Sequence, residues 1–246
     1  MAGSNFLTRY FRLDEDLNHV LAAISKDRVI TSAVQRFYGM RLARQDPWEC
    51  LASFVLATNA NIPRIRTMIA TICERYGGPF EFEGEPFHGF PSAGTLAAAS
   101  VVDLRRCGLG YRAPFLKRVA TSVAGGRVDF AKVQSLGYEG ARKELLSELF
   151  GEKLLLGVGP KVADCVLLFS CDKDDAFPID VWIARALAKS YPKMLGPKSR
   201  LIGDGKLRLS LRDYDRISGA ARRHFGKYAG YAQQYLYMAA REQELS

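Results

Sequence analysis

Closely spaced cysteines are absent from this sequence. Its 246 residues include five cysteines, and no two of them form a Cys-x-x-Cys pair. Zinc sites and iron–sulfur clusters need cysteines at short, regular spacings, so we expect neither. An odd number of widely spaced cysteines instead indicates free thiols in a reducing compartment. The five are Cys50, Cys73, Cys107, Cys165 and Cys171.

Signals for membrane insertion and secretion are also lacking. The most apolar stretch, Leu154 to Cys171, is interrupted by Lys161 and Asp164, which argues against a membrane span. Met1 to Arg12 has no apolar core of the kind found in signal peptides. We therefore expect an intracellular protein, of the cytoplasm, nucleoid or nucleus, that does not bind membranes.

Alternating runs of β-branched residues are scarce, and there is neither an internal repeat nor a linker between independent domains. Helix signals recur instead. Asp46, Pro47 and Glu49 form a capping box. Ile62 to Tyr76 has helical apolar spacing and ends at Gly77. These patterns predict an all-α fold, with further helices over about 112–123, 138–150, 160–171, 180–191 and 210–225 and at the end of the chain.

The sequence contains much more positive than negative charge. It has 35 Lys and Arg against 26 Asp and Glu, a formal net charge of +9. A surplus of cations favours polyanionic partners, because each neutralised phosphate releases counterions. Charge alone leaves two interpretations open, a nucleic-acid-binding protein or simply a basic one.

The sharpest local feature is the glycine turn Gly157-Val158-Gly159 between two expected helices. Such a turn leaves backbone N–H groups open at a helix N-terminus, which suits a phosphate oxygen. Its carbonyls could also hold a monovalent cation. The alternative is a helix–helix corner that needs glycine only for its bend.

Lys161 follows this turn in the first turn of the next helix. A cation there opposes the helix dipole, so either a phosphate lies nearby or the amine is partly neutral. A neutral lysine amine is the nucleophile in covalent catalysis. The alternative is a solvated lysine beside the hairpin. Asp180, at a further helix start, is either a simple N-cap or a carboxylate that stabilises an oxocarbenium-like sugar, and one residue can do both.

A glycine hairpin, a lysine and a Pro-x-Asp about twenty residues later are typical of the helix–hairpin–helix glycosylase superfamily. Within it the chain resembles the 8-oxoguanine DNA glycosylase/lyase family, from about Tyr10 to Met238. The resemblance is carried by Tyr10–Asp14, Arg44–Ile62, Phe87–Ser92, Gly108–Ala113, Lys161–Cys165 and Tyr228–Gln233.

This resemblance implies an enzyme that excises 8-oxoguanine from double-stranded DNA and then nicks the strand. Lys161 is the expected Schiff-base nucleophile and Asp180 its carboxylate partner. In the expected base pocket the ring of Tyr237 and the thiol of Cys165 sandwich the flipped base, and the amide of Gln233 hydrogen-bonds its Watson–Crick edge. That pocket comprises Cys165, Phe169, Gln233 and Tyr237.

The resemblance also implies DNA contacts outside the pocket. Asn59 is expected to fill the gap left by the flipped base, and Tyr111 to wedge the adjacent stack. Arg64 and Arg112 are expected to hold the orphaned cytosine, since the guanidinium fork donates parallel bonds. A structural K⁺ or Na⁺ at the hairpin is expected on the carbonyls of Lys153, Leu155 and Val158, and no cofactor is required.

Two departures from the family pattern bear on substrate recognition. Eukaryotic members have an N-terminal domain before the Tyr-Phe stretch, whereas this chain begins almost at Tyr10, so we expect that domain to be lacking. Trp182 stands where the family has a histidine two residues after the aspartate, so we expect a phosphate contact to be replaced by packing or stacking. Tyr228, Tyr231 and Tyr235 have the helical spacing of a core face.

The expected architecture is two helical lobes with the active-site cleft between them. Residues 1–44 and 166–246 form one lobe, and residues 45–165 form the other, which ends in a helix–hairpin–helix motif over about 145–171. We expect a monomer. Two alternatives stay open: a glycosylase of the superfamily for another damaged base, and a non-catalytic helix–hairpin–helix DNA-binding protein.

Overall fold

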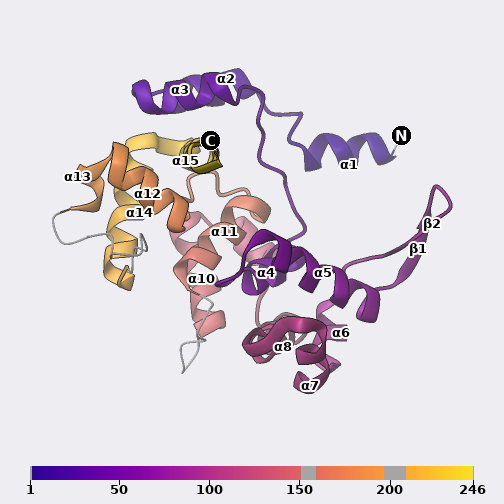
Figure 1. Ribbon diagram of the computed structural model, residues 1–246. Helices are drawn as coiled ribbons and strands as arrows, with labels where there is room; N and C mark the ends of the chain where they lie inside the picture. The colour runs from indigo at the N-terminus through magenta and orange to yellow at the C-terminus, as the bar shows by residue number, and fades with distance from the viewer. Residues whose placement is uncertain (1, 151–158, 197–208, 246) are drawn as a thin grey trace. The chain divides into compact units, whose positions relative to one another are not determined.

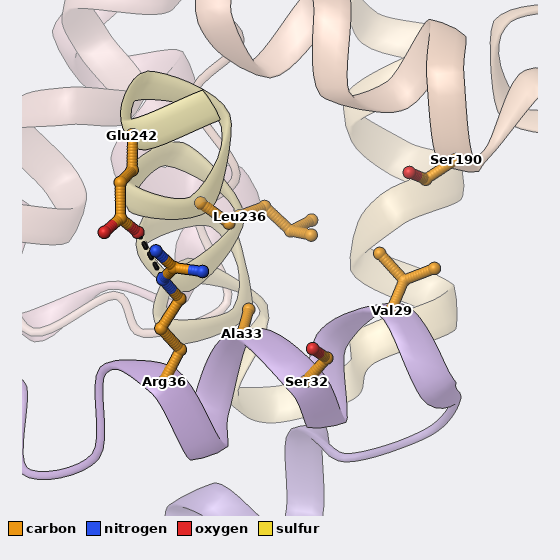
Figure 2. Close-up of a pocket in the computed structure, with 8 residues that line it drawn as sticks. Val29, Ser32, Ala33, Arg36, Ser190, Leu236 and Glu242 are labelled. Carbon is orange, nitrogen blue, oxygen red and sulfur yellow. Dashed lines mark ion pairs between the residues drawn. The ribbon is translucent and has the colours of Figure 1, made fainter. Parts of the chain in front are cut away.

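The computed structural model describes residues 2–150, 159–196 and 209–245 (Figure 1). Contacts divide the chain into two compact units. The central unit comprises residues 45–166, and the terminal unit joins residues 1–44 to residues 167–246. The sequence suggested boundaries after residues 44 and 165, whereas the contacts place the second boundary after residue 166.

The central unit consists of helices and one short β-hairpin. Its regular elements are α4 (Pro47–Leu56), α5 (Ile62–Tyr76), β1 (Pro79–Phe82), β2 (Glu85–His88), α6 (Ala93–Ala98), α7 (Val101–Leu104), α8 (Ala113–Ala124), α9 (Phe130–Ser135), α10 (Tyr138–Phe150) and the first part of α11 (Pro160–Ser170). Two short irregular helices, η1 (Arg105–Leu109) and η2 (Gly110–Arg112), connect α7 to α8.

Side-chain caps start the helices of this unit. The Asp46 carboxylate accepts from the backbone N–H of Glu49 at 2.9 Å, as the capping box predicts. Asn61 caps α5 through the N–H of Arg64 at 3.0 Å, and the bounds of α5 are those predicted. The helices bury a core of Leu51, Leu56, Ile72, Leu96, Leu104, Leu109, Leu116, Val133 and Leu145.

Within its described residues, the regular elements of the terminal unit are all helices. Its elements are α1 (Ala2–Tyr10), α2 (Leu17–Ile24), α3 (Arg28–Arg36), the end of α11, α12 (Val181–Ser190), α13 (Pro192–Leu195), α14 (Leu211–Phe225), η3 (Gly226–Tyr228) and α15 (Ala229–Leu245). Tyr231 and Tyr235 are fully buried, which confirms the core assignment of these two tyrosines, and Tyr228 is half-buried.

The fold class is all-α, as predicted, but several elements differ from the sequence-based expectation. The hairpin β1–β2 was not expected, because its strands contain no β-branched residue. Helices α1 to α3 were not expected either, although Asp16 and Asp27 cap α2 and α3. Helix α13 was not expected either, and residues 197–208, which follow it, lie outside the described residues.

Among the described residues, no helix is both long enough and apolar enough to cross a membrane.

Candidate active site

Lys161 lies in the first turn of α11. The carbonyl of Gly159 accepts from the backbone N–H groups of Val162 and Ala163 at 2.9 and 3.3 Å, which starts the helix at Gly159. The half-buried ammonium of Lys161 lies 4.7 Å from the ring centroid of Phe54, a residue of α4 in the same unit. A cation over an aromatic face is held by the ring quadrupole. The amine is therefore held against α4.

Two predicted pocket residues follow Lys161 on one face of α11. Cys165 and Phe169 are spaced four and eight residues after Lys161, so the three side chains form a stripe along the helix. Cys165 is buried and Phe169 is half-buried. Local helix geometry alone thus aligns the amine with a thiol and an aromatic ring.

A buried carboxylate on the neighbouring face anchors this helix. Asp164 is fully buried and accepts from the Tyr138 hydroxyl at 2.9 Å and from Nε of Arg142 at 3.1 Å, both on α10. A buried charge is stable only when it is paired and hydrogen-bonded. From the sequence Asp164 was expected only to interrupt an apolar stretch; the signal for its structural role was a lone carboxylate within that stretch, three residues after Lys161.

Asp180 is the N-cap of α12 in the terminal unit. Its Oδ1 atom accepts from the backbone N–H of Ile183 at 2.8 Å. The preceding segment is tied to α14, because the Ser218 hydroxyl donates to the carbonyl of Phe177 and the backbone N–H of Ile179 donates to the Tyr214 hydroxyl. The cap therefore fixes the carboxylate on a well-anchored helix start.

The other predicted pocket residues lie on α15 in the same unit. Gln233 is buried; its Nε2 donates to the carbonyl of Pro178 at 3.0 Å and its Oε1 accepts from Gln234 at 2.7 Å. An amide has two N–H donors and two lone pairs, so one of each remains for a base edge. The hydroxyl of Tyr237 accepts from Arg241 at 3.3 Å.

The ring of Trp182 packs against two arginines of the terminal unit. The guanidinium groups of Arg185 and Arg241 lie 5.3 and 6.0 Å from its ring centroid. Stacking, one of the two outcomes expected at this position, is what the structure has. Arginine is suited to it because its planar guanidinium is weakly hydrated.

Three of the predicted DNA-contact residues form one cluster in the central unit. Asn59 is exposed and has a φ of +50°, a left-handed conformation that asparagine tolerates. Its Nδ2 lies 3.4 Å from the hydroxyl of Tyr111, which donates to the carbonyl of Thr58 at 3.1 Å. The guanidinium of Arg112 lies 4.5 Å from the Tyr111 ring centroid.

Arg112 is only 3 % exposed, and its guanidinium group donates to backbone carbonyls of the turn that contains Asn59. Its Nε donates to the carbonyl of Thr58 at 2.9 Å, and its Nη2 donates to the carbonyls of Thr58 and Asn59. Arg112 thereby braces the left-handed turn that presents Asn59. Arg64, the second arginine expected on the orphaned base, lies exposed in the first turn of α5.

The remaining site predictions lie outside the described residues. They concern Gly157 and Val158 of the phosphate-binding hairpin and the carbonyls of Lys153, Leu155 and Val158 for a monovalent cation. Within residues 2–150, 159–196 and 209–245, no group of three or more His, Cys, Asp or Glu side chains could hold a metal ion.

Family models match nearly four fifths of the chain. One, described as "HhH-GPD superfamily base excision DNA repair protein", matches residues 52–193, and another, described as "8-oxoguanine DNA glycosylase, N-terminal domain", matches residues 2–51. A solved structure of an 8-oxoguanine glycosylase/lyase from Clostridium acetobutylicum is 32 % identical, with a TM-score of 0.83 over 98 % of this chain and 75 % of that one. The chain belongs to the 8-oxoguanine DNA glycosylase/lyase family.

Curated members of this family are similar along most of the chain. The probable N-glycosylase/DNA lyase of Methanothermobacter thermautotrophicus is 32 % identical over 89 % of this chain and 69 % of its own length. The N-glycosylase/DNA lyase of Saccharomyces cerevisiae is 31 % identical over 94 % of this chain and 65 % of its own length. This chain thus spans about two thirds of these relatives. Residues 2–51 match the model of the N-terminal domain, so they correspond to sequence of the domain that we expected to be lacking.

Proposed function

We propose that this chain is a bifunctional DNA glycosylase and lyase that excises 8-oxoguanine from double-stranded DNA. Its membership of the 8-oxoguanine glycosylase/lyase family supports this activity. One geometric observation carries the assignment of the nucleophile: Lys161 lies in the first turn of α11, two residues after Gly159, and its amine is held over Phe54.

The reaction needs an amine at the anomeric carbon of an extruded nucleotide. Nζ of Lys161 forms a bond to C1′ as the bond between C1′ and the base breaks, and the base leaves with the electron pair and takes up a proton. The sugar ring then opens to an imine with Lys161. Removal of a C2′ proton expels the 3′ phosphate by β-elimination, which nicks the strand.

Asp180 contributes a carboxylate where positive charge develops on the sugar. A negative charge held in place lowers the energy of an oxocarbenium-like transition state without reorganisation during the reaction. The N-cap bond to Ile183 supplies this rigidity. The same carboxylate relays protons between the departing base, Lys161 and C2′.

Flipping a base out of the stack costs a few kcal/mol. Asn59 offsets this cost by filling the gap, and Tyr111 does so by wedging the adjacent stack. Arg64 and Arg112 hold the orphaned cytosine. The flipped base is received by Cys165, Phe169, Gln233 and Tyr237.

Borohydride trapping tests the nucleophile. We expect wild-type protein to be trapped covalently on a duplex with 8-oxoguanine opposite cytosine and to nick it, while a guanine:cytosine duplex gives neither product. The variant Lys161→Gln should lose trapping and nicking but keep duplex binding. Lys143→Gln, which removes an exposed lysine of α10, is the matched control and should behave like wild type.

Trapping by Lys161→Gln would assign the imine to another amine and overturn the role of Lys161. A panel of duplexes with single lesions distinguishes the two alternative functions. Excision of a different oxidised or alkylated base in preference to 8-oxoguanine would indicate another glycosylase of the superfamily. Equal duplex binding by wild type and Lys161→Gln, without cutting by either, would indicate a non-catalytic DNA-binding protein.

A further inference from the structure

The hairpin formed by β1 and β2, residues 79–88, exposes all eight of its strand residues. It extends away from the helices of the central unit (Figure 1). Three of these residues are phenylalanines: Phe80, Phe82 and Phe87 are 53 %, 61 % and 45 % exposed. Large exposed apolar side chains that cluster, rather than scatter singly, mark interaction sites.

The three rings share one face of the hairpin. Phe80 pairs directly with Phe87 across the strands, and Phe82 lies two residues from Phe80 and therefore on the same side. The rings of Phe80 and Phe87 stack at 5.7 Å between centroids, and those of Phe82 and Phe87 meet edge to face at 6.5 Å. Glu85 pairs with Phe82, which places a carboxylate beside the rings.

The backbone of the hairpin is fixed at both ends. Glu83 and Gly84 have φ values of +52° and +80°, as a two-residue type I′ turn requires. At the other end the N–H of Gly89 donates to the carbonyl of Gly78 at 2.9 Å. A Cβ on Gly77 would lie 2.0 Å from the carbonyl oxygen of Gly89, so only glycine allows this close approach. The aromatic face is thus presented on a preformed element.

The charge of this region is opposite to that of the chain. Glu81, Glu83 and Glu85 lie in the hairpin, and no Lys or Arg occurs from residue 77 to residue 104 of a chain with a net charge of +9. Carboxylates repel phosphates, so the hairpin is unsuited to the DNA backbone.

A second copy of the chain is not a suitable partner for this surface. Two hairpins packed ring to ring would place the carboxylates of both copies side by side. Three half-exposed phenylalanines bury roughly 300 Å² per copy, well below the approximately 800 Å² per partner of a stable interface.

We propose that the hairpin is a docking site for an extended, arginine-bearing segment of a partner protein. A guanidinium stacks on a phenyl face more readily than an ammonium does. The carboxylates of Glu83 and Glu85 then pair with the same cation, and the partner's apolar side chains cover the remaining ring surface. The exposed strands allow the partner to add as a further strand.

Fluorescence anisotropy with a labelled peptide of alternating arginine and valine tests this directly, on the whole chain without DNA. A protein of charge +9 repels such a peptide overall, so binding reports a local acidic and aromatic site. We expect saturable binding of the arginine peptide by wild type. The double variant Phe82→Thr, Phe87→Thr should bind it about tenfold more weakly or worse, since threonine retains strand propensity but removes the rings. A peptide of alternating glutamate and valine, which the net charge of +9 attracts to other surfaces, should bind equally to wild type and to the phenylalanine variant.

Charge reversal gives a second readout. Glu83→Lys combined with Glu85→Lys should weaken binding of the arginine peptide while all three phenylalanine rings remain. Phe6→Thr is the matched control, because Phe6 is 64 % exposed but lies on α1, and it should bind like wild type. Excision of 8-oxoguanine should be unchanged in all three variants.

Three results would overturn the proposal. One is the absence of arginine-peptide binding by wild type up to about 1 mM, and another is equal binding by the hairpin variants and wild type. The third is loss of duplex binding or excision in the phenylalanine variant, which would make DNA the occupant of the hairpin. The first two results are measured with peptide and without DNA, so they stand whether or not the proposed excision activity is found.

Discussion

At the residue scale, Asp180 combines a structural and a proposed chemical role in one side chain. Its cap bond to Ile183 would make Asp180 necessary for α12 even in a protein without activity. Asparagine caps helices about as well as aspartate but carries no charge. The pair of substitutions Asp180→Asn and Asp180→Ala therefore separates the two roles.

We expect Asp180→Asn to unfold at nearly the wild-type temperature while its excision rate falls by roughly 10²- to 10⁴-fold. Asp180→Ala should lose the same activity and in addition about 1 kcal/mol of stability, because the cap is removed. Thermal unfolding and single-turnover excision on the same preparations measure the two effects. If Asp180→Asn excised the base at the wild-type rate, Asp180 would act only as a helix cap.

Individual residues also differ in how much of their role in the site the sequence can reveal. Lys161 and Asp180 are marked by local sequence signals, closely spaced glycines and a helix start, and both lie at the start of a helix. The partners of Arg112 are not marked, because they are the carbonyls of Thr58 and Asn59, more than fifty residues away. A resemblance can assign Arg112 to the orphaned base, but only the fold reveals that Arg112 also braces the turn of Asn59.

At the scale of helices and strands, the sequence predicts best those elements whose stabilising contacts lie within the same segment. Helix α5 has its predicted bounds because its cap, its apolar spacing and its terminal glycine all lie within the segment. The hairpin of residues 79–88 was missed because aromatic pairs across two strands hold it, rather than β-branched residues facing a core. Its signals were the alternation of Phe80 and Phe82 and the Glu-Gly turn.

Helix α3 illustrates an element whose start depends on distant residues. Asp27 caps it through the N–H groups of Val29 and Ile30, and also accepts from the Tyr191 hydroxyl at 3.0 Å and lies 3.2 Å from Nε2 of His224. Burial alone would raise the pKa of Asp27, but the bonds from Ile30, His224 and Tyr191 outweigh it and lower that pKa. The charged carboxylate is therefore favoured in the folded state.

A lowered pKa contributes stability above the unfolded-state value of about 3.9, and this contribution is lost as the pH falls through the folded-state value. We expect Asp27→Asn to destabilise the protein at pH 7 and to show a smaller loss of stability than wild type on acidification below about pH 4. Urea unfolding over this range measures both. Asp16→Asn, at the exposed cap of α2, is the control; an acid response of Asp27→Asn equal to that of wild type would contradict the role of the charge.

At the scale of the whole molecule, the terminal unit must join two segments that are more than a hundred residues apart in the chain. Arg12 makes this connection with a fully buried side chain. Its guanidinium lies 2.9 Å from Glu15, 2.8 Å from Asp174 and 3.1 Å from Asp172. Burial opposes the charge of Arg12, yet the carboxylates of Asp174, Glu15 and Asp172 outweigh burial and raise the pKa of Arg12.

Neighbouring groups extend this cluster. Arg44 pairs with Asp172 at 2.6 Å and with Glu15 at 3.2 Å, and the Tyr231 hydroxyl donates to Glu15 at 2.8 Å. The acidic loop of residues 172–175, which the sequence marks only as charged, is therefore an internal ion-pair site. That loop leads from α11 to the segment that carries Asp180, so the cluster fixes the path between the two proposed catalytic helices.

Removal of one member of a buried ion pair costs about 3–5 kcal/mol, because the partner charges are left buried and unpaired. We expect Arg12→Met to lower the free energy of unfolding by about this amount. Asp174→Leu added to Arg12→Met should restore part of the loss, since replacing both members of a buried pair by apolar groups is often neutral. Denaturant unfolding of the two single variants and the double variant gives the coupling. Strictly additive effects would show that Arg12 and Asp174 act independently, and that another contact holds residues 1–44 to the rest of the terminal unit.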